Sequence, residues 1–319
     1  MSPPDHDHLP RHPGRVHIAA RQRRTDLTAL GSLALHLPHL AASLAVVFVV
    51  SYALACLSNP PWWLFFGCWA ASGALVFHRP CERLMARCLF GLRYPTPEED
   101  GRLRPVWREV TARAGVDGGA YQLWIEESDG VNAMAAAGHI VGVTSHSLRT
   151  LTPGQLAGVL AHELGHHTRG HAWASLLSFW YALPARLAWR LLLRLATRLG
   201  RLPTGAAAVV IGVSGAAVAA LATATYGLIF LPLATPYLVA AVSRRSELRA
   251  DEHAAGLGFA PQLMAVLHQE RDMEECRRVL AAAPGAAFTK GGMIARLLDS
   301  HPDVHTRLHH LQTHVENRH

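Results

Sequence analysis

Three long stretches without a charged residue constrain what this chain of 319 residues can fold into. They cover residues 40–57, 62–77 and 206–242. A helix needs about 20 consecutive apolar residues to cross a bilayer, so the first stretch is long enough and the second is marginal. The third is longer than one crossing requires. The sequence therefore predicts an integral membrane protein with about four transmembrane helices.

The first two stretches form a predicted transmembrane hairpin that covers residues 26–77. A short SNPP turn at 58–61 separates them, and Trp62 and Trp63 follow it where an interfacial aromatic belt would lie. The first stretch is too long for a signal peptide and has no small-residue cleavage site before the turn, which predicts an uncleaved anchor. Residues 1–25 are rich in Pro, His and Arg and are predicted to be a disordered basic tail.

The net charge of +7 comes almost entirely from arginine, because the chain has one lysine, Lys290. No recognised nucleic-acid motif accompanies this charge, so we expect no nucleic-acid partner. The arginines instead flank the hairpin: Arg11, Arg15, Arg21, Arg23, Arg24, Arg79, Arg83, Arg87 and Arg93. By the positive-inside rule, both ends of the hairpin and the domain that follows it are predicted to be cytoplasmic.

A helix is predicted to begin just after Thr152, in the stretch LTPGQLAGVLAHELGHHTRGHA. Thr152 and Gln155 form a capping box, and Pro153 occupies the first helical position. The helix should run to about Gly170. Leucines spaced one turn apart are predicted to anchor it in a core: Leu156, Leu160 and Leu164.

The same helix carries an HExxH motif, His162-Glu163-x-x-His166. Two imidazoles one helical turn apart can reach a single ion at about 2.0–2.1 Å. The glutamate between them can take a proton from a water molecule that attacks a carbonyl. This spacing is typical of zinc hydrolases and predicts that the histidines face a cleft, nearly opposite the leucines.

The third metal ligand does not follow the motif directly. One zinc peptidase class extends it as HExxHxxGxxH, but this chain has Arg169 and Ala172 where glycine and histidine would be needed. A shift of one residue turns a helical side chain by about 100°, so His171 cannot substitute. We therefore expect His167 and His171 to be bystanders that pack or cap the helix.

No His, Asp or Glu occurs from 172 to 246, and the next candidates are Glu247 and Asp251 in SRRSELRADEHAAG. They lie one helical turn apart. A carboxylate that binds the metal, with a second one that orients a ligand histidine, is the usual arrangement around such sites.

Three separated motifs resemble the HtpX-like membrane zinc metallopeptidases, relatives of the CAAX prenyl endoproteases. VNAMAAAGHIVGVTSHSLRTLTPGQLAGVLAHELGH (131–166) resembles the run that ends in the family's zinc helix. SRRSELRADEHAA (243–255) resembles its ExxxD helix, and SHPDVHTR (300–307) resembles its late HP…R element. The resemblance covers most of residues 40–310.

This resemblance implies roles for individual residues. The implied Zn²⁺ ligands are His162, His166 and Glu247, with Glu163 as general base and Asp251 as the partner of a ligand histidine. His301 and Arg307 match later family positions that lie near the site and steady the oxyanion or bind substrate. An edge strand would pair with an extended substrate: Asn132, Ala133, Met134, Ala135 and Ala136. The family usually has an aromatic residue in place of Met134.

The predicted fold is a mainly α membrane protein with a small α+β zincin-like catalytic domain, split into residues 78–171 and 244–319. Strands are expected within 121–128 and 131–143, with the zinc helix packed beneath them. Residues 172–243 form the predicted membrane insertion. Within it, arginines at every fourth position predict an amphipathic helix on the membrane surface: Arg186, Arg190, Arg194 and Arg198.

Two topologies of this insertion remain open. In the first, 206–242 is a hairpin of two spans that turns near 223–227. In the second, the chain crosses once at 172–193 and once at 206–242. Either arrangement crosses the membrane an even number of times, so that Glu247 can reach the histidines.

The predicted function is zinc-dependent endoproteolysis on the cytoplasmic side of the cell membrane by a multi-pass protein. The resemblance implies misfolded or membrane proteins as substrates and membrane-protein quality control as the setting. Two alternatives are a membrane sensor that cleaves one regulatory partner or itself, and a catalytically inactive scaffold. The small loop at 58–61 offers no sensing domain, and the intact Glu163 disfavours the scaffold.

Overall fold

A computed structural model describes most of the chain. The described residues are 31, 34–58, 61–128, 133–136, 139–168, 171–199, 231–281 and 303–317, with isolated positions between 205 and 223. The chain divides into two compact units. Phe77–Leu176 and Ala240–His319 belong to the first, and Ser32–Val76 and Leu177–Val239 belong to the second.

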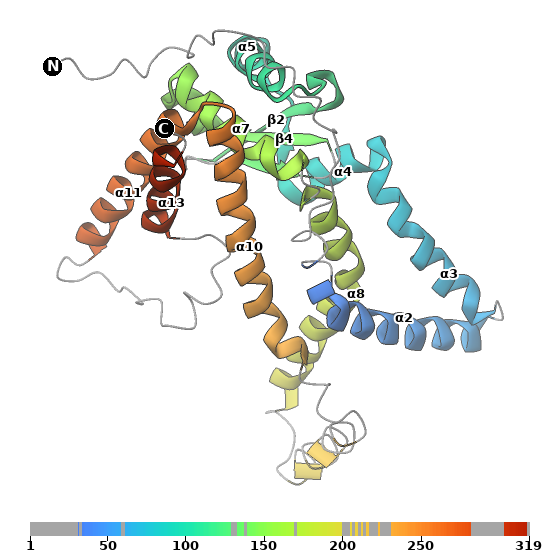
Figure 1. Cartoon of the computed structure of the whole chain (residues 1–319). Coiled ribbons are helices and arrows are strands. Elements are labelled where there is room, and N and C mark those ends of the chain that lie inside the picture. Colours follow the sequence, from blue (N-terminus) through green and yellow to red (C-terminus); the bar gives the residue numbers. More distant parts are fainter. Residues whose placement is uncertain are drawn as a thin grey trace, which may run out of the picture. The chain divides into compact units, whose positions relative to one another are not determined.

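The second unit contains the predicted N-terminal hairpin, in which α2 (Leu37–Ser58) and α3 (Trp62–Ser72) contact each other (Figure 1). The rings of Phe48 and Trp62 meet edge to face across the turn, with centroids 5.3 Å apart. A 3₁₀ helix, η1 (Gly73–Phe77), follows α3. Because α2 and α3 are both apolar, they pack against each other through rings such as those of Phe48 and Trp62.

Membrane association is supported by one helix. Leu37–Leu57 is the only helix in the described ranges that is long and apolar enough to cross a bilayer, while Trp62–Leu75 is apolar but shorter. Most of the third apolar stretch, 206–242, lies outside the described residues, so the four spans remain a prediction.

A four-stranded sheet lies in the first unit, with the order β1-β2-β4-β3. Its strands are β1 (Leu92–Arg93), β2 (Gln122–Glu126), β3 (Ala133–Ala136) and β4 (Ile140–Thr144). The central pair β2 and β4 is parallel, and both outer strands run antiparallel to their neighbours. β2 and β3 fall within the predicted segments and β4 extends one residue beyond them, whereas the two residues of β1 are too few to give a strand pattern in the sequence.

Helices surround this sheet (Figure 1). Those within the first unit are α4 (Arg79–Phe90), α5 (Pro97–Ala114), η2 (Gly118–Ala120), α6 (Ser145–Thr150), α7 (Pro153–Thr168), α11 (Ala260–Ala281) and α13 (Val304–Glu316). Two long helices have residues in both units: α8 (His171–Leu199) and α10 (Leu231–Gly256). The predicted mainly helical fold with a small sheet is confirmed.

Helix α7 begins with the predicted capping box. The Thr152 backbone N–H donates to Gln155 Oε1 at 3.0 Å, and the Gln155 backbone N–H donates to Thr152 Oγ1 at 3.4 Å. These bonds satisfy backbone donors that the first turn of a helix leaves without partners. The described part of the helix reaches Thr168, and the predicted end near Gly170 lies outside the described residues.

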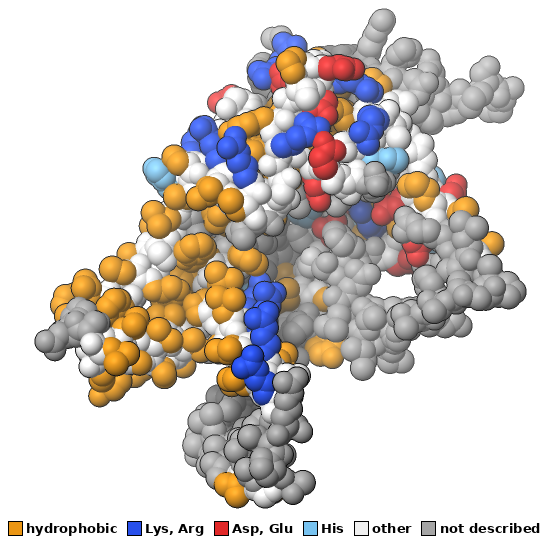
Figure 2. Space-filling model, turned by 180° about the vertical axis from the view of Figure 1, so that it is seen from behind, with side chains coloured by type: hydrophobic (Ala, Val, Ile, Leu, Met, Phe, Trp, Pro, Cys, Tyr) orange, Lys and Arg blue, Asp and Glu red, His pale blue; other side chains and the backbone are white. Residues whose placement is uncertain are grey.

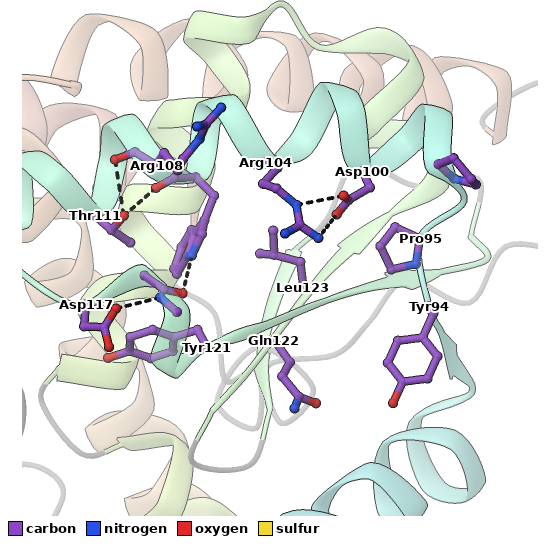
Figure 3. Close-up of a pocket in the computed structure, with 14 residues that line it drawn as sticks. Tyr94, Pro95, Asp100, Arg104, Arg108, Thr111, Asp117, Tyr121, Gln122 and Leu123 are labelled. Atoms are coloured by element: carbon purple, nitrogen blue, oxygen red, sulfur yellow. Dashed lines mark hydrogen bonds and ion pairs between the residues drawn. The ribbon is translucent and has the colours of Figure 1, made fainter.

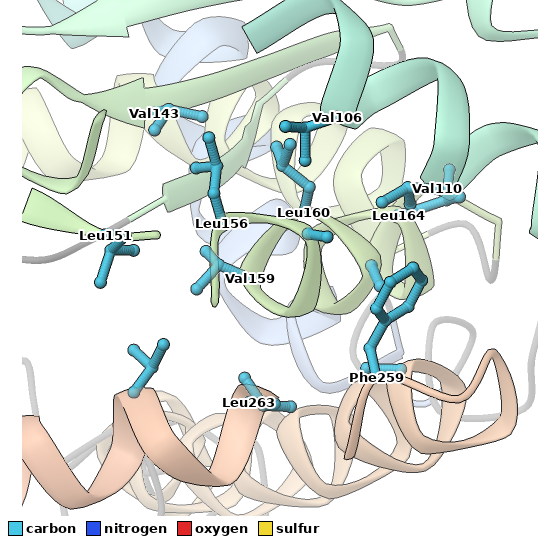
Figure 4. Close-up of a cluster of buried hydrophobic side chains, with 14 of the residues drawn as sticks. Val106, Val110, Val143, Leu151, Leu156, Val159, Leu160, Leu164, Phe259 and Leu263 are labelled. Atoms are coloured by element: carbon cyan, nitrogen blue, oxygen red, sulfur yellow. The ribbon is translucent and has the colours of Figure 1, made fainter. Parts of the chain in front are cut away.

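The core of the first unit forms around α7. Leu156, Leu160 and Leu164 are all buried, as predicted, and belong to one hydrophobic cluster with residues of α5, β4 and α11. Figure 4 shows α7 between Val106 and Val110 above it and Phe259 and Leu263 below it. Almost every residue of α7 is buried, so its histidines point toward another helix and not toward open solvent.

Candidate metal centre

The HExxH motif lies in the second half of α7, with His162 and Glu163 buried and His166 partly buried. Their spacing places the two imidazole rings on the same side of the helix, where the ring centroids are 5.0 Å apart. The capping box and the leucines fix the position of this helix in the core. The histidines are therefore held by packing rather than by a mobile loop.

Helix α10 supplies the third donor. Glu247 Oε2 lies 3.4 Å from His162 Nε2, and Glu247 Oε1 lies 3.3 Å from His166 Nε2. One ligand atom from each of the three residues lies within 4.8 Å of the others. Ligands about 2.0–2.1 Å from a tetrahedral zinc ion are separated by about 3.3 Å, so this donor set and its spacing fit zinc.

A second carboxylate on α10 orients the first histidine. Asp251 is fully buried, and its Oδ1 lies 2.8 Å from His162 Nδ1. With an ion bound, a proton on Nδ1 that is donated to Asp251 would leave the Nε2 lone pair to bind that ion beside Glu247. Burial by itself lowers the pKa of His162, but the Asp251 and Glu247 carboxylates outweigh it and raise the pKa to about 10. The surroundings of this imidazole therefore favour a cation.

The guanidinium of Arg307, on α13, holds Asp251 from the other side. Its Nη2 and Nε donate to Asp251 Oδ1 and Oδ2 at 2.6 and 2.9 Å. Burial alone would raise the pKa of Asp251, but the hydrogen bonds from Arg307 and the adjacent His162 outweigh it and lower the pKa. Arg307 thus contacts the carboxylate behind the histidine, and the Nε and Nη2 atoms of its guanidinium group are both bonded there.

Ser246 is a residue near the site that the sequence reasoning missed. Its Oγ lies 3.4 Å from His166 Nδ1, on the ring nitrogen that does not face Glu247. Metal-binding histidines usually have a hydrogen-bonding partner on this second nitrogen. The signal was available, because Ser246 immediately precedes the candidate ligand Glu247.

Gly165 is a second missed residue, inside the HExxH motif itself. A Cβ atom at this position would lie 3.1 Å from Ala250 Cα and 3.1 Å from His253 Cβ, both on α10. The absence of a side chain therefore allows α10 to approach α7 closely. Gly158 has the same role toward α11, since its Cβ would lie 2.9 Å from the Leu263 backbone nitrogen.

Glu163 differs from the other carboxylates of the cluster. It is only 6% exposed, yet it makes no hydrogen bond or ion pair with another residue in the described part of the chain. Its carboxylate oxygens are not among the fully buried atoms that lack a hydrogen-bond partner, so they reach the surface of the site. Such a group beside a cation site is available to exchange a proton with a bound molecule.

The remaining predicted residues fall in three groups. His167 is buried, and its Nε2 lies 2.9 Å from the Ile140 carbonyl oxygen while its ring packs against Tyr121, so the structure places it in the core. His171 begins α8. Asn132 and His301 lie outside the described residues.

The predicted substrate strand corresponds to β3. Ala133, Met134, Ala135 and Ala136 pair antiparallel with β4 and form an edge of the sheet. Helix α7 contacts β3. The edge strand and the zinc-helix candidate are thus neighbours in the same unit.

A groove of about 950 Å³ lies elsewhere in the first unit, along α5, η2 and the start of β2 (Figure 3). None of the metal-centre residues lines it. The polar groups of its walls bond to one another: Arg104 pairs with Asp100, and Trp107 Nε1 donates to the Gly118 carbonyl. This groove is therefore separate from the candidate metal centre on α7 and α10.

Comparison with known families gives one match. The model described as Peptidase family M48 matches residues 97–315, a range that contains all the residues of the cluster. No curated protein matches the chain at a significant level.

Proposed function

Because the chain belongs to peptidase family M48, the family of HtpX-like and CAAX-protease-like zinc metallopeptidases, we propose that it is a zinc-dependent membrane endopeptidase. One observation carries the proposal. Two imidazole nitrogens and a carboxylate converge within 4.8 Å, beside the buried and unpaired Glu163. A protein that only needed a stable core would gain nothing from this arrangement, because burying unpaired charge opposes folding.

His162, His166 and Glu247 would hold the zinc ion. When bound, zinc supplies polarisation of the scissile carbonyl and lowers the pKa of a water molecule. Glu163 accepts a proton from the attacking water on its carboxylate and then donates it to the leaving amine. Its position next to His162 in the sequence keeps it beside the candidate metal site.

Asp251 and Arg307 act on the histidine rather than on the substrate. Asp251 fixes the ring orientation and the protonated nitrogen of His162, and Arg307 fixes Asp251 through two hydrogen bonds. We therefore assign Arg307 a positioning role and keep oxyanion stabilisation as the proposed role of His301.

The substrate is proposed to be a polypeptide in extended conformation. The strand β3, from Ala133 to Ala136, lies at the edge of the described sheet and can pair with such a chain through backbone hydrogen bonds. Asn132 would extend the same edge. Main-chain pairing requires an unfolded segment, which is consistent with misfolded or membrane proteins as substrates.

The proposed setting is the cytoplasmic side of the cell membrane, in membrane-protein quality control. The apolar helix Leu37–Leu57 and the arginines that flank the hairpin support this orientation. We propose four spans, with the catalytic domain formed by 78–171 and 244–319, the hairpin by 26–77, the membrane insertion by 172–243, and a basic tail by 1–25.

The test compares the purified full chain with the Glu163→Gln variant, measuring bound zinc and cleavage of an unfolded polypeptide. We expect wild type to bind zinc and cleave, and Glu163→Gln to keep its zinc but to cleave at least about 100-fold more slowly. Glu252→Gln is the matched control, since Glu252 lies on α10 but pairs with His310. Equal cleavage by wild type and Glu163→Gln would contradict the mechanism. Zinc binding by wild type without any cleavage would favour the inactive scaffold.

A further inference from the structure

A row of arginines runs along the C-terminal half of α8, in the second unit. Arg186, Arg190, Arg194 and Arg198 are spaced one helical turn apart, and all four are exposed. Figure 2 shows a line of basic side chains on the surface with hydrophobic side chains beside it. At 1.5 Å per residue the row is about 18 Å long. We refer to these four residues as the arginine row.

The arginine row has no counterions of its own. The sequence segments of its unit, 32–76 and 177–239, contain no Asp or Glu. Within the described part of the chain, none of the four guanidinium groups forms an ion pair, and the one specific contact is that of Arg186 with the Phe179 ring, 5.2 Å from its centroid. The opposite charge must therefore come from outside this unit.

The rest of the helix surface is apolar and equally exposed. Six large side chains between the arginines are 47–60% exposed: Leu187, Trp189, Leu191, Leu192, Leu193 and Leu195. With 100° between successive residues, the arginines occupy about one third of the circumference, and all of these side chains except Leu187 fall in the remainder. A helix with a basic sector and a leucine-rich sector lies in the interface of a bilayer, with the basic groups among the headgroups.

We propose that the arginine row binds the headgroups of anionic phospholipids. The guanidinium group donates two parallel hydrogen bonds to phosphate oxygens, and anionic headgroups supply the negative charge that the second unit lacks. An acidic protein partner would match the charge but would leave the leucine sector without cover. The bilayer matches both sectors at once, and the inference does not depend on the peptidase activity.

The experiment uses the full chain reconstituted into phosphatidylcholine vesicles with a trace of spin-labelled lipid. It compares the association of labelled phosphatidylglycerol and labelled phosphatidylcholine with the protein. One arginine near an anionic surface contributes about fivefold in binding. The measured preference is an average over all lipid at the protein surface. We therefore expect wild type to prefer phosphatidylglycerol by at least about twofold, and this preference to decrease as salt is added.

Three variants separate charge at this site from charge in general. The triple variant Arg190→Gln/Arg194→Gln/Arg198→Gln should lose the preference, and the corresponding triple lysine variant should retain most of it. The control Arg102→Gln/Arg108→Gln/Arg149→Gln removes the same charge from exposed positions of the first unit and should behave as wild type. Thermal unfolding of each variant checks that it is folded. The proposal is overturned if wild type shows no preference, if the glutamine variant keeps it, or if the control variant loses it equally.

Discussion

At the scale of single residues, two buried carboxylates one helical turn apart on α10 have different partners. Glu247 faces both imidazole Nε2 atoms, whereas Asp251 contacts His162 Nδ1 and Arg307. The difference supports the roles proposed for them, because a metal ligand must present a lone pair to the ion and a positioning group must hold the far side of the ring. Asp251 also compensates a buried guanidinium, so it contributes to stability as well as to the site.

We expect Asp251→Asn to lower zinc affinity by about 10–100-fold, since the amide cannot hold the His162 ring as the carboxylate does. It should also destabilise the fold by about 3 kcal/mol, because Arg307, whose side chain is only 12% exposed, loses the carboxylate with which it pairs. Competition with a chelator measures the affinity, and thermal unfolding of the zinc-free chain measures the stability. Unchanged zinc affinity in Asp251→Asn would mean that another group orients His162.

At the scale of elements, the approach of α10 to α7 brings the donors together. Gly165 lies where α10 packs against α7, and its missing side chain leaves room for Ala250 and His253. An alanine there meets backbone atoms, which cannot rotate away as a flexible side chain would. The helix that carries Glu247 must therefore shift.

Gly165→Ala is expected to destabilise the protein by about 1–3 kcal/mol and to weaken zinc binding, because Glu247 moves with α10. Gly101→Ala is the matched control: Gly101 is exposed in α5, and its Cβ would meet nothing within 4 Å. That substitution should stabilise the chain by up to about 1 kcal/mol through helix propensity. Thermal unfolding and zinc content measured on both variants would show whether close packing is the cause.

The start of α5 carries a pH-dependent contact. The Arg93 guanidinium donates two hydrogen bonds to Glu99, which also closes a capping box with Thr96. The hydrogen bonds from Arg93 lower the pKa of Glu99 from its ordinary value of 4.5 to about 2, although burial acts in the opposite direction. In the folded state, Arg93 therefore binds the carboxylate form of Glu99 more tightly than its protonated form.

The sign of this linkage follows from the lowered pKa. The stabilisation by Glu99 is fully present above pH 4.5 and is lost as the pH falls toward 2. Because Arg93 is partly exposed to solvent, we expect Glu99→Gln to cost about 1–2 kcal/mol at neutral pH rather than the full value of the shift. Near pH 2 wild type and variant should have equal stability, as measured by denaturant unfolding across this range. A difference that persists at low pH would point to a cause other than the charge.

At the scale of the whole molecule, the proposed topology has a direct test. In a variant that retains Cys276 as its only cysteine, a membrane-impermeant maleimide should label this exposed residue only after the cells are permeabilised. A cysteine at Asn59, between α2 and α3, should be labelled in intact cells. Labelling of Cys276 from outside would reverse the orientation that the flanking arginines predict.

Local features of the fold could be predicted because they depend on residues close together in the chain. The capping box at Thr152 and Gln155, the leucine stripe of α7, and the strands within 121–128 and 131–143 each follow from a few neighbouring residues. β1 could not be predicted, because two residues become a strand only when β2 lies beside them.

The sequence by itself determined the charge-free stretches and two spacings of one helical turn. One spacing separates His162 from His166, and the other separates Glu247 from Asp251. Only the tertiary structure decided that these two pairs meet, since 81 residues separate His166 from Glu247 and no local interaction sets their distance. Close packing at Gly165 sets it, together with the buried ion pair between Asp251 and Arg307. Local spacing fixes which way a side chain points on its helix, and only the packing of helices fixes what it faces.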